Sequence, residues 1–250
     1  MAIPDSVAIL DADLHEIFGA RLRSLVAYGV RASAAPHAGV HAHGDGHHPE
    51  RALAHTLAIA DTLTAEDLRA CAGRVKKWDA AGLAPPLLLA AHEFERSLDA
   101  FPLEFGAIIA DHVVVSGKNP FEGLRVDAAD VRRACELQAR SHLLHLREGY
   151  LETRGNPDAL AVLIVQSAAP FAALLGAIAR LQAASGAATG DAGASARYVE
   201  RLLDVPGGVV GDVVKLAGVT EIPAAEAGRM FPAYLDAVER LVKFVDGWKA

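Results

Sequence analysis

A short stretch between residues 37 and 48 holds five of the eleven histidines in this 250-residue chain. Imidazole nitrogens are good ligands for Zn²⁺ and Ni²⁺, and a short histidine-rich tract is a compositional cue for metal binding. The candidate ligands are His41, His43, His47, His48 and His55. The tract lies among glycine and alanine and lacks the fixed spacing of a structural zinc site, so weak incidental binding is the alternative interpretation.

Three further groups have residue types that bind metals elsewhere. Asp11 and Asp13 are two residues apart in a helical pattern, as are Glu93 and Glu95. Side chains at i and i+2 of a helix diverge, so neither pair is expected to share one metal ion. The third group is the pair of histidines in "RSHLLHLREGY", three residues apart on one helix face, which we interpret as surface or interface polar groups.

Composition limits the classes of function. The chain is 52% hydrophobic and 22% charged, which is enough to bury a sizeable core. Its net charge of −7 argues against a broad surface for nucleic acid or anionic membranes. Cys71 and Cys135 are far apart and lie among helix-forming residues, which favours two reduced core thiols in a cytoplasmic protein. The first residues do not resemble a signal peptide.

One segment is long enough to span a bilayer. Residues 159–179 carry no charge over 21 positions, but the run is rich in alanine and has Gln166, Ser167 and Pro170 near its middle. We therefore predict a central helix surrounded by other helices, and no membrane partner.

The first half of the chain alternates helix and strand patterns. Apolar residues four apart predict a helix over 5–23, and a capping-box pattern from Thr64 predicts another over 64–82. Short apolar runs predict the strands. They are expected at 24–29, 56–63, 85–91, 101–109 and 112–117.

From about residue 127 onward the patterns are almost entirely helical. Helices are predicted over 127–153, 157–184, 195–205 and, most clearly, 230–248. The sequence therefore predicts an α+β fold with a mixed sheet and flanking helices in residues 1–120, followed by an all-α bundle in residues 121–250.

The stretch "LVAYGVRAS" carries a family resemblance. With Tyr28, Gly29 and Arg31 it resembles the nucleotidyltransferase superfamily with a DNA polymerase β-like fold, in the small bacterial branch related to kanamycin nucleotidyltransferase. The resemblance implies a Gly-Ser turn that holds phosphate oxygens and an Asp-x-Asp strand. Residues i and i+2 of a strand share a face, so both acids reach Mg²⁺, and a third carboxylate follows on a later strand.

The chain departs from that pattern where the metal would bind. Val30 occupies the serine position, and His55 and Leu57 fall on the two acid positions. Asp61 shares their strand face but lies four residues beyond Leu57, about 13 Å along a strand. Glu104 in "FPLEF" is the best candidate for a remnant third carboxylate, and an ordinary strand-end glutamate is the alternative.

The main hypothesis is therefore a nucleotidyltransferase-like protein that has lost Mg²⁺-dependent transfer. It would bind a nucleoside triphosphate through Tyr28, Gly29, Val30 and Arg31, or a protein partner, and the long apolar helices would allow a homodimer. One alternative is an active, Mg²⁺-dependent transferase using Glu104 with Asp45, Glu50 or Asp61. The other is Zn²⁺ or Ni²⁺ binding by the histidine-rich tract.

Overall fold

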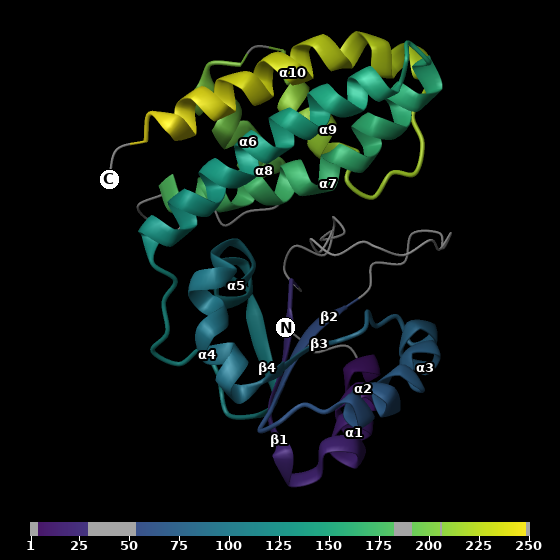
Figure 1. The fold of residues 1–250 in the computed structure, drawn as a ribbon, viewed down its shortest axis with the longest axis vertical. Coiled ribbons are helices and arrows are strands. Elements are labelled where there is room, and N and C mark those ends of the chain that lie inside the picture. Colours follow the sequence, from purple (N-terminus) through teal and green to yellow (C-terminus); the bar gives the residue numbers. More distant parts are fainter. Residues whose placement is uncertain (1–4, 30–53, 183–191, 206, 249–250) are drawn as a thin grey trace. The chain divides into compact units, whose positions relative to one another are not determined.

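The computed structural model describes residues 5–29, 54–182, 192–205 and 207–248. These residues form two compact units, a sheet unit that ends at Asp127 and a helical unit that begins at Ala128 (Figure 1). A mixed sheet with flanking helices followed by a helical region confirms the predicted α+β class.

The sheet unit has four strands in the order β3-β2-β1-β4. They are β1 (Leu22–Tyr28), β2 (His55–Ala60), β3 (Leu87–Ala90) and β4 (His112–Gly117). The central strand β1 pairs antiparallel with both β2 and β4, and β3 pairs parallel with β2. Each of these strands overlaps a stretch predicted to be a strand, with β1 starting at Leu22 and β2 at His55, slightly before the predicted positions 24 and 56.

One face of the sheet packs against α1 (Asp5–Phe18), α2 (Ala65–Ala72) and α3 (Val75–Ala80). The helix predicted over 64–82 is two helices, because the chain turns at Gly73 and Arg74. The predicted capping box is confirmed, with Thr64 and Asp67 bonded reciprocally. The first helix ends at Phe18 rather than residue 23, and a 3-10 turn, η1 (Gly19–Arg21), leads into β1.

The opposite face packs against α4 (Ala91–Ala100) and α5 (Pro102–Ala110). The prediction of a strand over 101–109 was wrong. Pro102 at the start of the helix, Glu104 in its first turn and a buried stripe of Pro102, Phe105 and Ile108 fit a helix. A continuous apolar run does not by itself separate a strand from a buried helix.

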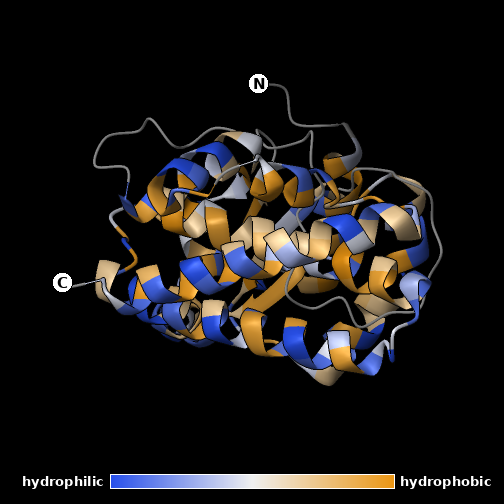
Figure 2. Ribbon diagram, turned by 90° about the horizontal axis from the view of Figure 1, so that it is seen from above, coloured by the Kyte–Doolittle hydropathy of each residue, from blue (hydrophilic) through white to orange (hydrophobic). Residues whose placement is uncertain are grey.

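The helical unit contains five helices among the residues that the structure describes. They are α6 (Ala128–Glu152), α7 (Pro157–Gln182), α8 (Ala192–Leu203), α9 (Val209–Lys215) and α10 (Ala224–Asp246). Apolar and polar segments alternate along these helices (Figure 2). The short helix α9 was not predicted; it follows Gly207 and Gly208, which both have positive φ.

Helix α7 is long and apolar enough to cross a membrane. It packs against α6, α8, α9 and α10, and residues such as Ile164, Phe171 and Leu175 are fully or almost fully buried. Its hydropathy is therefore that of a core helix, as predicted.

Both cysteines are buried free thiols, as the sequence predicted. Burial raises the pKa of the Cys71 thiol, and it raises the pKa of Cys135 to about 12. Because the thiolate is the reactive form, neither cysteine is a candidate nucleophile.

Candidate functional site

Three polar aromatic side chains form a row across the sheet where β1 ends. Tyr28 on β1 is paired in register with His55 on β2 and with His112 on β4. The Tyr28 and His55 rings are stacked with centroids 5.8 Å apart. All three residues are half-buried, and burial raises the pKa of the Tyr28 hydroxyl. We call Tyr28, His55 and His112 the polar row.

His112 has a defined proton position. Its Nδ1 lies 3.2 Å from the carbonyl oxygen of Ile108 and 3.1 Å from that of Ile109. A carbonyl oxygen only accepts, so Nδ1 carries the proton and Nε2 has the free lone pair. The ring is held edge-on by Phe121, with centroids 4.8 Å apart. Sequence reasoning missed His112, because only strand pairing brings it to Tyr28.

The glycine of the predicted turn follows the polar row. Gly29 has a φ of +69°, a left-handed conformation that suits glycine. Its N–H donates to the backbone oxygen of Asp111, 3.1 Å away. The Gly29 N–H is therefore not available to a phosphate oxygen in this structure. Val30 and Arg31, which the sequence predicted as nucleotide-binding residues, lie outside the described residues.

The next row on the same face of the sheet is entirely apolar. Val26 pairs with Leu57 on one side and with Val114 on the other. Val26 and Leu57 are completely buried in a cluster with aromatic and aliphatic residues of α4 and α5. The cluster includes Phe94, Phe105, Ile108 and Phe121. The second acid position of the family pattern is thus part of the hydrophobic core.

The other predicted carboxylates do not join the polar row. Glu104 lies in the first turn of helix α5, where its charge favours the helix dipole, and not on a strand. Asp61 follows the opposite end of β2 and forms an ion pair with Arg23. Glu93 accepts a hydrogen bond of 2.8 Å from the N–H of Ala90, so it caps α4. No group of three metal-binding side chains occurs among the described residues.

The sequence-predicted histidine ligands can be placed only in part. His55 belongs to the polar row, whereas His41, His43, His47 and His48 lie outside the described residues, as do Asp45 and Glu50. Metal binding by this tract stays a prediction.

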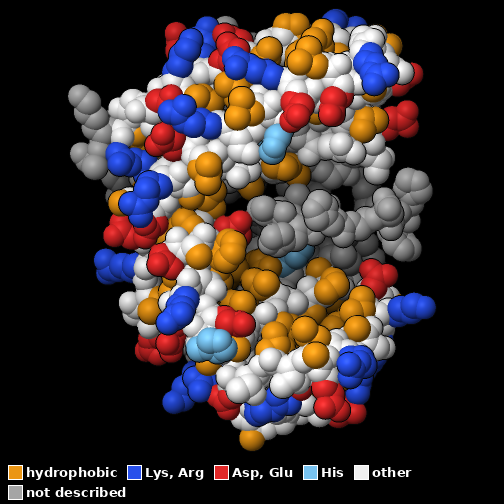
Figure 3. All heavy atoms as spheres, in the orientation of Figure 1, with side chains coloured by type: hydrophobic (Ala, Val, Ile, Leu, Met, Phe, Trp, Pro, Cys, Tyr) orange, Lys and Arg blue, Asp and Glu red, His pale blue; other side chains and the backbone are white. Residues whose placement is uncertain are grey.

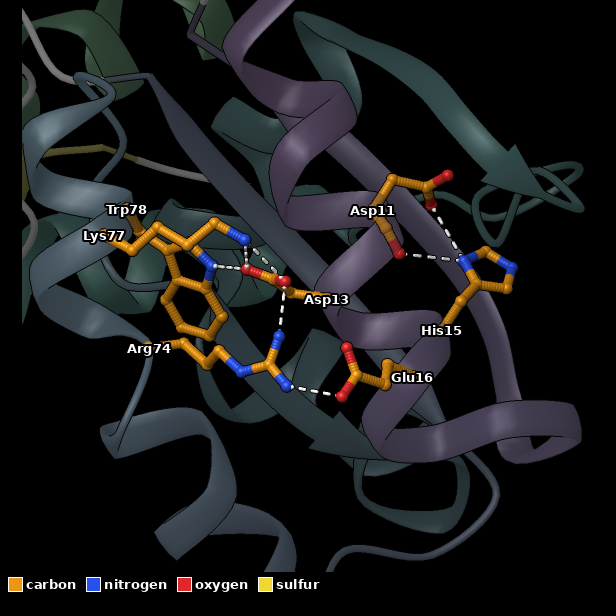
Figure 4. A network of polar contacts seen from close by, with 7 residues as sticks. All are labelled: Asp11, Asp13, His15, Glu16, Arg74, Lys77 and Trp78. Carbon is orange, nitrogen blue, oxygen red and sulfur yellow. Dashed lines mark hydrogen bonds and ion pairs between the residues drawn. The ribbon is translucent and has the colours of Figure 1, made fainter.

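Asp11 and Asp13 diverge on α1, as expected from helix geometry (Figure 4). Asp13, only 3% exposed, accepts hydrogen bonds from Arg74, from Lys77 Nζ at 2.8 Å and from Trp78 Nε1 at 2.9 Å. Asp11 instead accepts from Ser116 Oγ at 2.5 Å. Burial opposes the charge on Asp13, but the three donors outweigh it and lower the pKa of the carboxyl. Asp13 therefore joins α1 to α3 and is a structural residue.

The helical unit has its own buried series of hydrogen bonds. His142 Nε2 lies 2.7 Å from the hydroxyl of Tyr234, which donates to Ser167 Oγ at 3.1 Å. Ser167 donates in turn to the Ile164 carbonyl at 2.8 Å. Each hydroxyl hydrogen is used, so the His142 proton resides on Nε2. The interpretation of this histidine pair as surface or interface polar groups fits His145, which is exposed, but was wrong for His142, which is 7% exposed inside the helical unit.

The similarity of this chain to known proteins lies in its fold and not in its sequence. No protein-family model matches the sequence, and no curated protein matches it. The structure is similar to that of spectinomycin adenyltransferase AAD(9) from Enterococcus faecialis, solved with ATP and spectinomycin. The TM-score is 0.54 at 8% sequence identity, over 95% of this chain and 98% of the other. The chain therefore has a kanamycin-nucleotidyltransferase-like fold, which confirms the resemblance seen in the sequence.

Proposed function

We propose that this chain, which has the fold of a nucleotidyltransferase, binds a nucleoside triphosphate beside the polar row and does not catalyse Mg²⁺-dependent nucleotidyl transfer. The fold supports the first part, because the similar enzyme was solved with ATP. The complete burial of Leu57 carries the second part.

Electrostatics disfavours Mg²⁺-dependent transfer in this chain. Mg²⁺ requires oxygen ligands, and two-metal transfer needs carboxylates that face the same metal pair. At the positions of the two acids this chain has an imidazole and a buried leucine. Moreover, Leu57 is enclosed by apolar side chains, so a carboxylate or a hydrated ion there would be desolvated without compensation.

The polar row supplies different chemistry at the same end of the sheet. The Tyr28 hydroxyl and the His55 imidazole can donate hydrogen bonds to phosphate oxygens, whereas the Nε2 lone pair of His112 can accept one from a hydroxyl or amine of the nucleoside. The stacked Tyr28 and His55 rings also present an aromatic surface. None of these groups requires a divalent metal, so triphosphate binding should persist when Mg²⁺ is removed.

The direct test is calorimetric titration of the full chain with ATP and with GTP, each with Mg²⁺ and with EDTA. We expect saturable binding in both conditions and no release of pyrophosphate. Tyr28→Ala should weaken binding about tenfold or more, whereas His15→Ala, on the exposed side of α1 and on the other face of the sheet, should not. Absence of saturable binding contradicts the binding proposal, and Mg²⁺-dependent pyrophosphate release contradicts the loss of transfer.

A second experiment asks whether the acid position can be restored. Leu57→Asp is expected to lower the free energy of unfolding by about 4 kcal/mol, because it places a charge in an apolar cluster. Leu68→Asp, at a leucine that is 48% exposed on α2, is the matched control and should change stability by less than about 1 kcal/mol. Denaturant unfolding measures both. A stable Leu57→Asp protein that gains Mg²⁺-dependent transfer would show an open metal site instead.

The two alternative functions considered from the sequence, active transfer and metal binding, can be tested on the same protein. An active transferase using Glu104 predicts labelled product that disappears in Glu104→Ala. Metal binding by the histidine-rich tract predicts stoichiometric Zn²⁺ or Ni²⁺ uptake that disappears when residues 37–48 are deleted. Weak, substoichiometric uptake would end that alternative.

A further inference from the structure

The three most exposed large apolar side chains in the described part of the chain are leucines of α6. Leu137 is 72% exposed, Leu144 61% and Leu151 75%. They are seven residues apart, so they form one stripe along the helix. Apolar side chains reach the surface of the helical unit between charged ones (Figure 3). Single exposed leucines are common, but three aligned on one face of a helix are typical of an interaction surface.

The stripe belongs to a sequence repeat. Residues 133–153 read "RACELQA RSHLLHL REGYLET", with arginine first and leucine fifth in each group of seven. The opposite face of the helix, with Cys135, Ala139 and Leu146, is buried in the bundle. Helix α6 therefore has one apolar face that the bundle uses and a second that faces outward at the seven-residue period of a coiled coil.

Charges along the stripe define a partner orientation. By helix geometry, Arg140 and Arg147 lie on one flank of Leu144, and Glu148 and Glu152 lie on the other. Arg140 and Arg147 are about half exposed and also pair with Asp246 and Glu239 of α10. Two copies of α6 packed in parallel about a twofold axis place the arginine flank against the acidic flank. Antiparallel packing places arginine against arginine.

We propose that a second copy of this chain binds here, α6 against α6 in parallel, through the leucine stripe. Helix α6 has 25 residues, which is about 37 Å of helix. A stable interface commonly buries about 800 Å² on each partner, and a single helix pair buries less. The dimer is therefore weak and forms reversibly at micromolar concentrations.

Sedimentation of the full chain between about 1 and 300 µM tests the dimer. The wild type should pass from monomer to dimer, and Leu144→Glu should raise the dissociation constant about 100-fold, because two charges enter the apolar stripe at each dimer. Leu68→Glu, at an exposed leucine of the sheet unit, is the matched control and should dimerise like the wild type. A wild type that stays monomeric, or a dimer that survives Leu144→Glu, overturns the proposal.

A single cysteine tests the orientation. Both native thiols are buried, so Leu151→Cys at the end of the stripe introduces an accessible one. In the parallel dimer the two copies of residue 151 lie opposite each other, whereas antiparallel packing places residue 151 opposite residue 137, so mild oxidation should give a covalent dimer only in the parallel arrangement. The double variant Leu151→Cys with Leu144→Glu should not cross-link at the same concentration. A concentration-dependent dimer in which Leu151→Cys fails to cross-link overturns the parallel arrangement.

Discussion

Each unit has a buried polar centre held by several partners, and these two centres differ in charge. In the sheet unit the centre is Asp13, an anion held by Arg74, Lys77 and the Trp78 indole (Figure 4). In the helical unit it is His142, a neutral imidazole bonded to Tyr234 and stacked on Phe171 at 5.3 Å between centroids. Burial lowers the pKa of His142 to about 4, with a smaller contribution from His145.

The difference separates structural polar groups from candidate functional ones. Both centres have their hydrogen bonds satisfied inside their own unit, which is what a buried polar group needs to be tolerated. The polar row of Tyr28, His55 and His112 is only half-buried and lies at a strand end. Depth of burial therefore does not mark the candidate site here, and incomplete enclosure at the end of β1 is what makes the polar row the candidate.

The comparison predicts that the two units respond differently to acid, with the larger effect in the helical unit. The pKa of His142 is about 4 in the folded chain and about 6.5 when unfolded. As pH falls from 6.5 to 4, the unfolded chain takes up a proton that the folded chain does not. The contribution of His142 is thus fully present above pH 6.5, and about 3 kcal/mol is lost by pH 4.

Denaturant unfolding at pH 7, 5.5 and 4.5, with hydrogen exchange to resolve residues 128–248, measures this loss. His142→Gln should flatten the pH dependence of the helical unit, while His145→Gln, at the exposed neighbour, should leave it steep. If the pH dependence of unfolding is unchanged in His142→Gln, the neutral imidazole of His142 is not the cause of the loss of stability in acid.

The anionic centre should lose its contribution in a lower pH range. The pKa of Asp13 is lowered below its ordinary value of 3.8, so its contribution persists through the range in which His142 loses its own and is lost as pH falls from 3.8 through the lowered pKa. Asp13→Asn is expected to cost about 2 kcal/mol, because it removes a charged acceptor from three donors. Asp11→Asn, two residues away and more exposed, is the control and should cost less than about 1 kcal/mol.

The Asp13 prediction has a local reporter. The Trp78 indole N–H should be protected from exchange in the wild type and in Asp11→Asn, and should exchange faster in Asp13→Asn. Equal protection in all three proteins would contradict the proposed role of Asp13.

The sequence predicted most of the architecture, because period and capping are local properties. The strands at β1, β2 and β4 and the helices α7 and α10 follow directly from apolar spacing. The strand predicted over 101–109 failed because an uninterrupted apolar run fits a buried helix equally well.

The site depended on long-range pairing, which the sequence does not display. His55 was expected near Tyr28, but His112 comes from a strand more than 80 residues further along the chain and was not singled out. The one available signal was the alternation in "HVVVSG", which places His112 and Val114 on the same face. Similarly, the substitution of leucine at position 57 was visible in the sequence, whereas its burial beneath α4 and α5 required the fold.

The smallest predicted effect concerns the chain of hydrogen bonds from His142. Tyr234→Phe removes one hydroxyl and keeps the ring, which packs edge-on against Phe171 at 5.2 Å between centroids. The His142 Nε2–H then has no acceptor, while Ser167 still donates to Ile164. We expect a loss of about 1.5 kcal/mol in the free energy of unfolding of the helical unit. Tyr150→Phe, at a tyrosine 46% exposed and stacked on Phe231, is the control and should change stability by less than about 0.5 kcal/mol. Equal losses in the two variants would mean that the hydrogen bonds from His142 through Tyr234 to Ser167 add no stability beyond packing. The neutral centre would then differ from Asp13 in how it stabilises its unit as well as in charge.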